Sequence, residues 1–231
     1  ETYFWRRPGQ GPRRAVVGNG DACAVIAPTP GMQLAVSTDT LVEGRHFLST
    51  VSPARLGHKA LAVNLSDLAA CGAAPVAFTL ALTLPRVDEA WLRGFAKGLL
   101  ALADEHDCEL IGGDTTRGPA TFSVTVHGFV PTGQAIQRSG AKAGDVVFVT
   151  GTLGDAAGAL LNLQMAHPST SVANAHEQFL LDRLNRPLAR IEAGVALRNL
   201  ASACIDVSDG LLADLGHVAN ASNVGIEIGE D

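Results

Sequence analysis

Residues 34–40 have the sequence Leu34-Ala35-Val36-Ser37-Thr38-Asp39-Thr40, a short apolar run that leads into hydroxyl side chains and a carboxylate. The apolar part has the composition of a buried strand, and a carboxylate directly after such a strand lies at the sheet edge where open α/β folds bind ligands. The same pattern recurs along the chain, so we expect several aspartates at the edge of one sheet. The segments are Gly20-Asp21, Ser37-Thr38-Asp39-Thr40, Asn64-Leu65-Ser66-Asp67, Gly112-Gly113-Asp114-Thr115-Thr116 and Asp206-Val207-Ser208-Asp209-Gly210.

Around these segments, short β-rich runs alternate with longer helical patterns, which predicts an α/β (α+β) fold. A polar, turn-rich stretch at 131–145 divides a strand-rich first part from a helix-rich second part, and this predicts two domains, 1–137 and 138–231. The last expected strand has no partner after it, so we expect the second domain to be incomplete. The expected strands are 14–17, 24–27, 34–37, 76–84, 110–111, 121–130, 146–150 and 226–228. The expected helices are 55–70, 88–106, 154–164, 177–184, 188–201 and 210–221.

Composition excludes several classes of protein. Of 231 residues, 47% are hydrophobic and 17% are charged, which is typical of a globular chain and not of a disordered one. The net charge of -6 argues against general nucleic-acid binding, which needs a basic surface. The four cysteines lie far apart, so neither a zinc cluster nor a disulfide framework is indicated. Without a secretory pattern or an uninterrupted apolar span, the expected location is the cytoplasm, with no membrane partner.

The common catalytic motifs are also missing from the sequence. There is no Gly-Lys dipeptide of a P-loop, no protein-kinase metal triplet, no nucleophile elbow and no zinc-protease histidine pair. A phosphate cradle built from several lysines is not expected either, because the chain has only Lys59, Lys97 and Lys142.

Aspartates that converge on one pocket would instead suit Mg²⁺. This ion takes one or two protein carboxylates, keeps several waters and is completed by substrate phosphates. A single aspartate in such a position is usually a helix cap or a turn residue. Asp39, Asp114 and Asp206, however, each end a strand-like run, so as a set they predict a magnesium and phosphate site.

Five strings of residues, in order and spacing, resemble the thiamine-monophosphate kinases, a family with the aminoimidazole-ribonucleotide synthetase-like fold. The resemblance extends from about Val17 to Gly225, which is nearly the whole chain. It implies a two-domain fold in which the first domains of a homodimer form a shared β-barrel. The strings are STDTLVEGRHF at 37–47, KALAVNLSDLAA at 59–70, LIGGDTTRG at 110–118, RSGAK at 138–142 and DVSDGL at 206–211.

The resemblance also implies an activity, namely transfer of the γ-phosphoryl group of ATP to thiamine monophosphate, with several Mg²⁺ ions. The attacking phosphate oxygen is already ionised near neutral pH, so no general base and no other catalytic side chain is expected. ATP and thiamine monophosphate are the expected partners. The implied metal ligands are Ser37, Thr38, Asp39, Asp67, Asp114, Asp206 and Asp209, the implied ATP contacts are Gly113, Asp114, Arg138 and Ser208, and the implied thiamine monophosphate contact is His46.

Two features depart from the family pattern. The family has two consecutive aspartates in its first glycine-rich motif and uses the second as a metal ligand, whereas here Asp21 is followed by Ala22. The alanine is either a lost ligand or an engineered substitution. Family members also continue beyond the last motif, and Gly229-Glu230-Asp231 resembles the start of a later one, in which Glu230 would contact the substrate.

Other interpretations stay open at this point. By residue type alone, His46 is a packed or solvent-facing histidine and Arg138 is a surface residue of the linker. For the chain as a whole, one alternative is another ATP-using synthetase of the same superfamily, such as a selenophosphate or aminoimidazole-ribonucleotide synthetase. A second alternative, of a different class, is a catalytically impaired nucleotide-binding protein.

Overall fold

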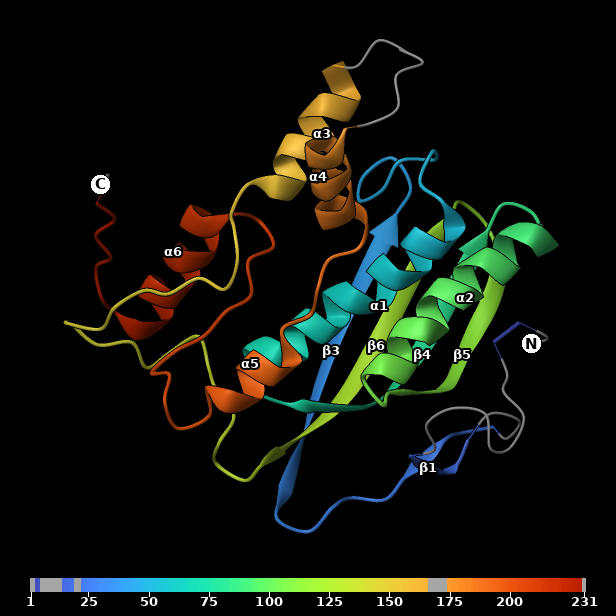
Figure 1. Cartoon of the computed structure of the whole chain (residues 1–231). Helices are drawn as coiled ribbons and strands as arrows, with labels where there is room; N and C mark the ends of the chain where they lie inside the picture. The colour runs from blue at the N-terminus through green and yellow to red at the C-terminus, as the bar shows by residue number, and fades with distance from the viewer. Residues whose placement is uncertain (1–2, 5–13, 19–21, 166–173, 230–231) are drawn as a thin grey trace.

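The computed structural model describes residues 3–4, 14–18, 22–165 and 174–229, and its centre is a four-stranded sheet in the order β3–β6–β4–β5. β6 pairs antiparallel with β3 and with β4, whereas β4 and β5 are parallel. Two helices, α1 and α2, cover one face of this sheet (Figure 1). The elements are β3 Met32–Val42, α1 Pro53–Ala70, β4 Ala74–Leu84, α2 Glu89–Glu105, β5 Glu109–Arg117 and β6 Thr121–Pro131, with a separate pair of strands β1 Ala15–Val17 and β2 Val25–Ile26.

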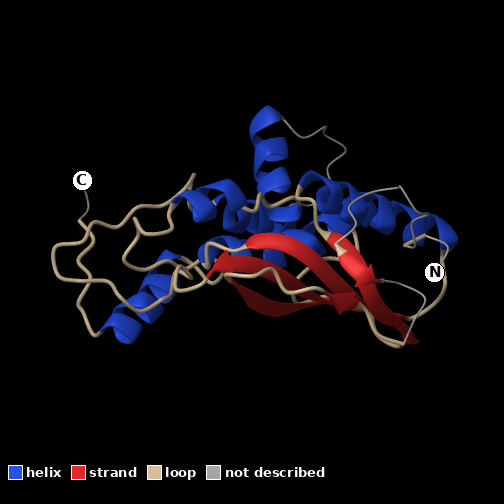
Figure 2. Cartoon of the chain, turned by 90° about the horizontal axis from the view of Figure 1, so that it is seen from below, coloured by secondary structure: helices blue, strands red, loops and turns tan. Residues whose placement is uncertain are grey.

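The core lies between the sheet and the two helices. Along β6, every second side chain is buried on the helix side, including Phe122, Val124 and Val126, while Thr125 and its alternate neighbours lie on the other side. This alternation is typical of an antiparallel strand with one face in a core. The helices that cover the sheet therefore form one layer and its strands another, as Figure 2 shows. The predicted α/β (α+β) fold class is confirmed.

Helices α1 and α2 approach each other closely because each presents a glycine at the contact. A methyl group on Gly98 would overlap the carbonyl oxygen of Ala54, and one on Gly57 would overlap that of Phe95.

We therefore expect Gly98→Ala to lower the free energy of unfolding by about 1–3 kcal/mol, the usual cost of overpacking. Gly216→Ala, in a helix position with no atom within 4 Å, should instead leave the protein as stable or raise stability by about 0.5–1 kcal/mol. Chemical denaturation of both variants measures the difference, and equal effects would contradict it.

The second part of the chain is mainly helical. Helices α3 and α4 pack against each other and project away from the sheet, whereas α5 lies against α1 (Figure 1). α6 begins after Gly210, and the left-handed Asn223 ends it. None of the helices in the described ranges is both long enough and apolar enough to cross a membrane. The elements are α3 Asp155–Met165, α4 Ala175–Asn185, α5 Ile191–Ala196 and α6 Leu211–Ser222.

Several expected elements differ in the structure. The runs 146–150 and 226–228 are not strands, because no neighbouring strand in the described part of the chain accepts their backbone hydrogen bonds. Phe148 in the first run is accordingly 87% exposed. The helix expected at 188–201 is confined to α5. β3 and β5 are longer than expected, so their aspartates lie inside paired strands and do not follow them.

Candidate metal and phosphate site

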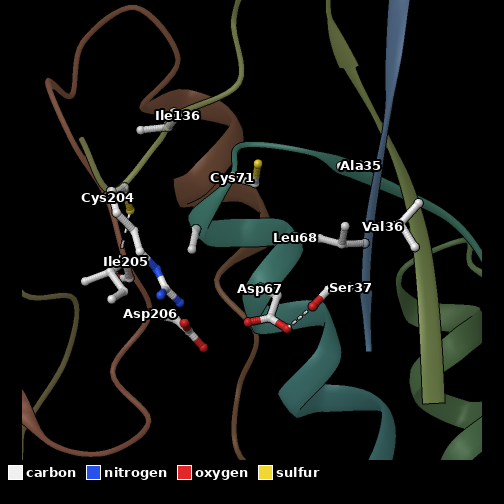
Figure 3. A pocket seen from close by; sticks show the side chains of 12 residues that line it. Ala35, Val36, Ser37, Asp67, Leu68, Cys71, Ile136, Cys204, Ile205 and Asp206 are labelled. Carbon is white, nitrogen blue, oxygen red and sulfur yellow. Dashed lines mark hydrogen bonds between the residues drawn. The ribbon is translucent and has the colours of Figure 1, made fainter. Parts of the chain in front are cut away.

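A cavity of about 250 Å³ lies where the first part of the chain meets the second. One wall comes from the free edge of β3, and another comes from the C-terminal half of α1 (Figure 3). The remaining walls come from two segments far along the chain, on either side of α3, α4 and α5. The lining residues are Ala35, Val36, Ser37, Asp67, Leu68, Ala70, Cys71, Ile136, Arg138, Cys204, Ile205 and Asp206.

Two carboxylates from distant segments, Asp67 on α1 and Asp206 before α6, point into this cavity (Figure 3). The Ser37 hydroxyl donates a hydrogen bond of 2.5 Å to Asp67 Oδ2. Burial raises the pKa of Asp67, although the Ser37 hydrogen bond and the Arg138 charge oppose that rise. Burial also raises the pKa of Asp206, and the charge of Asp67 raises it further.

Asp39 on β3 belongs to the same group of charges. Burial raises its pKa, and the charge of Asp206 adds to the rise. The charge of Asp39 in turn raises the pKa of Asp67. Three acids from β3, α1 and the segment before α6 therefore share one electrostatic environment, which we name the acidic cluster: Asp39, Asp67 and Asp206. A bound cation would offset their mutual repulsion.

The backbone of Asp39 is fixed by a residue that sequence reasoning missed. β3 is an edge strand, so the N–H groups on its outer side have no strand partner. The Asp39 N–H donates instead to Asn64 Oδ1 at 2.9 Å, and Asn64 Nδ2 donates to the Ala60 carbonyl oxygen at 3.0 Å. Asn64 is only 1% exposed. Its signal in the sequence is an amide within a helix whose buried residues are mostly apolar.

The segment before α6 is held by a second residue that the sequence did not reveal. Asp214, which is 3% exposed, accepts the backbone N–H groups of Ser208, Asp209 and Gly210 at its Oδ2 atom, at 2.9, 3.2 and 3.1 Å. Consecutive N–H groups of this kind commonly bind an external anion. Here the protein's own carboxylate occupies them. A ligand contact by Ser208 is therefore not expected through its backbone N–H group.

Arg138 reaches the cavity because backbone hydrogen bonds fix the segment that carries it. The Ile136 N–H donates to the Cys71 carbonyl oxygen at 3.0 Å, and the Cys204 N–H donates to the Gln137 carbonyl oxygen at 2.9 Å. Arg138 is exposed at the mouth of the cavity. Burial raises the pKa of the Cys71 and Cys204 thiols, so both line the cavity as neutral groups.

Other predicted site residues lie elsewhere in this chain. β3 and β5 form opposite edges of the sheet, and the register runs from Asp39 through Val124 and Leu80 to Gly113. Three strand spacings put Gly113 roughly 14 Å from Asp39. Asp114, the next residue, pairs with Ala81 and so faces away from α1 and α2.

Thr38, Asp209 and His46 have distinct surroundings. The Thr38 hydroxyl makes a 2.9 Å hydrogen bond with that of Thr125, on the sheet face opposite the helices. Asp209 is exposed, three residues after Asp206 in the segment before α6. His46 is exposed in the turn after β3, where its Nδ1 accepts the Val42 N–H at 3.0 Å. Ala22 is exposed near β2, whereas Asp21 and Glu230 lie outside the described residues.

The donor set fits magnesium. In the described part of the chain, no three His, Cys, Asp or Glu side chains are close enough to hold an ion unaided. Mg²⁺ does not require three, because waters and substrate phosphates complete its shell. The available donors are carboxylate and hydroxyl oxygens, which are the ligands this hard cation prefers. The acidic cluster with Ser37 is therefore suited to Mg²⁺ that arrives with a phosphate ligand.

Comparison with known proteins agrees with this fold. The protein-family model for the AIR synthase related protein N-terminal domain matches residues 20–130. The family model for the C-terminal domain matches residues 142–231. The two matches, together with the fold, make this chain an AIR synthase related protein. The division at residues 137 and 138 stays a prediction.

More specific relatives share one name. The thiamine-monophosphate kinase of Salmonella typhimurium is 53% identical over 214 residues, which are 93% of this chain and 65% of that protein. The crystal structure of thiamine-monophosphate kinase from Stenotrophomonas maltophilia has a TM-score of 0.84 and 50% identity, over 91% of this chain and 67% of that one. A structure of AaThiL complexed with AMPPCP and TMP has a TM-score of 0.79 and 34% identity, over 85% and 63% of the two chains.

The chain belongs to the thiamine-monophosphate kinase family. It spans about two thirds of the length of these relatives, 65% for the Salmonella protein.

Proposed function

We propose that this chain carries the metal and phosphate site of an enzyme that transfers the γ-phosphoryl group of ATP to thiamine monophosphate. The observation that carries the proposal is the convergence of Asp67, Asp206 and Arg138 on one cavity, from segments far apart in the sequence, with the charge of Asp39 acting on the same carboxylates. Family membership supports it. So does the complex of the relative AaThiL with AMPPCP and TMP.

In the proposed reaction, a phosphate oxygen of thiamine monophosphate attacks the γ-phosphorus of ATP. The bond from that phosphorus to the β,γ-bridging oxygen breaks, and ADP leaves as thiamine diphosphate forms. The nucleophile is already an anion, so no side chain has to remove a proton. Asp39, Asp67 and Asp206 would supply carboxylate ligands, one or two to each Mg²⁺, with waters and substrate phosphates completing the shell, and the Arg138 guanidinium would bind a phosphate by its planar fork. The metal supplies the positive charge that lets two phosphorylated molecules meet.

We propose a homodimer as the working unit. The sheet face opposite the helices carries exposed apolar side chains on β3, with Met32, Leu34 and Val36 at 41%, 54% and 55% exposure. A second copy over this face would bury them. Gly113 and Asp114 lie at the far edge of the same sheet, so we propose that they bind nucleotide or metal only in the assembled enzyme.

The direct test follows ³¹P spectra of the purified chain with ATP, Mg²⁺ and thiamine monophosphate. We expect thiamine diphosphate and ADP to form together, and neither without the acceptor. The matched variant is Ala22→Asp, which restores the family's second aspartate and should raise activity or lower the Mg²⁺ concentration needed. Silence from both proteins, with a non-hydrolysable ATP analogue still bound, would replace the kinase proposal with the nucleotide-binding alternative.

A further inference from the structure

Helix α1 leaves one stripe of side chains open along its length. Most of the helix is buried, but from Lys59 onward the partly exposed residues recur at helical spacing and lead to the cavity. Lys59 and Asp67 lie at opposite ends of this stripe, roughly 12 Å apart along the helix axis. The stripe therefore joins a cation at one end to the acidic cluster at the other. Its members are Lys59, Val63, Ser66, Asp67 and Ala70.

Lys59 has an ammonium group that no carboxylate among the described residues neutralises. None of the ion pairs found within the described ranges includes it. Its Nζ donates one hydrogen bond, of 3.0 Å, to the carbonyl oxygen of His46. An ammonium carries three N–H donors, so two remain. Burial lowers the pKa of Lys59, as expected for a cation without a nearby carboxylate.

The single hydrogen bond of Lys59 is not needed to hold the turn that it contacts. Residues 43–47 are already closed by the Gly44 N–H to the Phe47 carbonyl oxygen and by the His46 N–H to the Val42 carbonyl oxygen, both 2.9 Å. The Phe47 ring stacks on Phe122 in the core, with centroids 5.3 Å apart. Lys59 therefore has no counter-ion in the described ranges and no structural task in this turn, which leaves its ammonium group available to a ligand.

The imidazole of His46 adds a donor on the residue whose carbonyl oxygen Lys59 contacts. Its Nδ1 accepts the Val42 N–H at 3.0 Å, and in the neutral ring this assigns the proton to Nε2. His46 is exposed, so its Nε2–H is free to meet a ligand. Two N–H donors of Lys59 and one of His46 thus lie at the same end of the stripe, on adjoining residues of α1 and the turn.

We propose that Lys59 is a phosphate-binding residue which, with His46, binds a substrate phosphate at the end of the stripe opposite the acidic cluster. This inference rests on the proposed function and deepens it. Two phosphate groups that meet head to head need positive charge on both sides of the reacting pair. Metal at the acidic cluster supplies one side, and Lys59 supplies the other. The phosphate belongs to thiamine monophosphate or to ATP.

The first test uses the chemical reactivity of the three lysines, Lys59, Lys97 and Lys142, each followed by peptide mass spectrometry under trace acetylation. All four samples contain Mg²⁺. One has no ligand, and the others have thiamine, thiamine monophosphate or AMPPCP; equilibrium dialysis confirms that each ligand is bound. We expect thiamine monophosphate to slow Lys59 acetylation about fivefold or more. Thiamine should not slow it, and the acetylation rate of the exposed Lys97 should be the same in every sample. Protection by AMPPCP alone would assign the phosphate to the nucleotide.

The outcomes separate the two proposals. One outcome is that thiamine monophosphate and AMPPCP both bind while Lys59 is acetylated as fast as in the free protein. This result would overturn the role of Lys59 and leave the proposed function standing. No binding of either ligand would overturn the proposed function, and the role of Lys59 with it.

The second test separates phosphate binding from a structural role. Lys59→Met should weaken binding of thiamine monophosphate by about tenfold or more, the usual effect of losing a charge-assisted hydrogen bond, and should leave thiamine binding within about twofold. Lys59→Arg should restore most of the affinity, and Lys97→Met is the matched control. Equal loss for thiamine and its monophosphate, or no rescue by arginine, would overturn the inference; the acetylation of the native chain decides it if the methionine variant does not fold.

Discussion

Replacing Asp67 by asparagine is expected to lower the rate of phosphoryl transfer by roughly a hundred- to a thousandfold, the usual cost of removing one electrostatic contact to a reacting group. The amide keeps the shape of the side chain and can still accept the hydrogen bond from Ser37. What is lost is the negative charge, and with it one ligand for Mg²⁺. The fall should be deepest at low Mg²⁺ concentration, because the metal binds less tightly.

The same substitution should make the metal-free protein more stable. The acidic cluster is partly buried, and the charges of its members oppose one another. Removing one charge relieves part of this repulsion, so the unfolding midpoint in the presence of a chelator should rise by about 1–3 °C. Activity and stability therefore move in opposite directions, which a general structural lesion would not produce.

Two measurements on Asp67→Asn test both halves of this prediction. Initial rates are followed across a Mg²⁺ titration, and thermal unfolding is recorded with chelator. Glu192→Gln, which removes an exposed carboxylate on α5, is the matched control and should alter neither quantity. A variant with unchanged rate, or one that is both slower and less stable, would show that Asp67 is not part of a metal site.

Local patterns in the sequence predicted most of the elements. Helices α1 and α2 have side-chain caps at Ser52 and Asp88, and β6 alternates strictly between buried and partly exposed side chains. These features depend on neighbours in the sequence, so they can be recognised without the fold. The expected strands at 146–150 and 226–228 failed for the complementary reason. A strand needs a partner for its backbone, and none is present in the described chain.

Asp39 and Asp114 show where sequence reasoning ends. Both were expected to end strands and to gather at one sheet edge. In the structure each lies within a strand, because the β-forming threonines around it continue the pairing, for example from Thr40 to Ser123. Their strands then occupy opposite edges, which depends on strand order. That order is a property of the whole chain, and no local pattern specifies it.

The acidic cluster itself was partly predictable. Asp39, Asp67 and Asp206 were named from their motifs, and the structure brings them to one electrostatic environment although Asp67 lies on a helix and not at the end of a strand. No role was predicted for the residues that position them. Asn64 and Asp214 each act through backbone N–H groups, and the sequence shows only a polar residue on a buried helix face.

Asp214→Ala is expected to produce the largest structural effect of any single substitution near the site. Three backbone N–H groups, of Ser208, Asp209 and Gly210, would lose their acceptor at once. Each unsatisfied buried donor costs about 1–3 kcal/mol, although water admitted to the site would repay part of this. We therefore expect the free energy of unfolding to fall by about 2–4 kcal/mol, a severe loss for a single substitution.

Asp214→Ala should loosen the segment before α6 more than the rest of the fold. Amide hydrogen exchange at residues 208–210 should accelerate more than exchange in β6, because the segment before α6 is released while the sheet stays formed. Asp206 lies in that segment, so phosphoryl transfer should fall as well, even at temperatures where the variant is folded.

Asp214→Asn keeps an oxygen acceptor without the charge and should recover part of the stability. Asn220→Ala, an exposed position on the same helix, should change stability by no more than about 0.5 kcal/mol. Uniform acceleration of exchange across the sheet and α6 would mean that Asp214 stabilises the fold as a whole and does not specifically position Asp206.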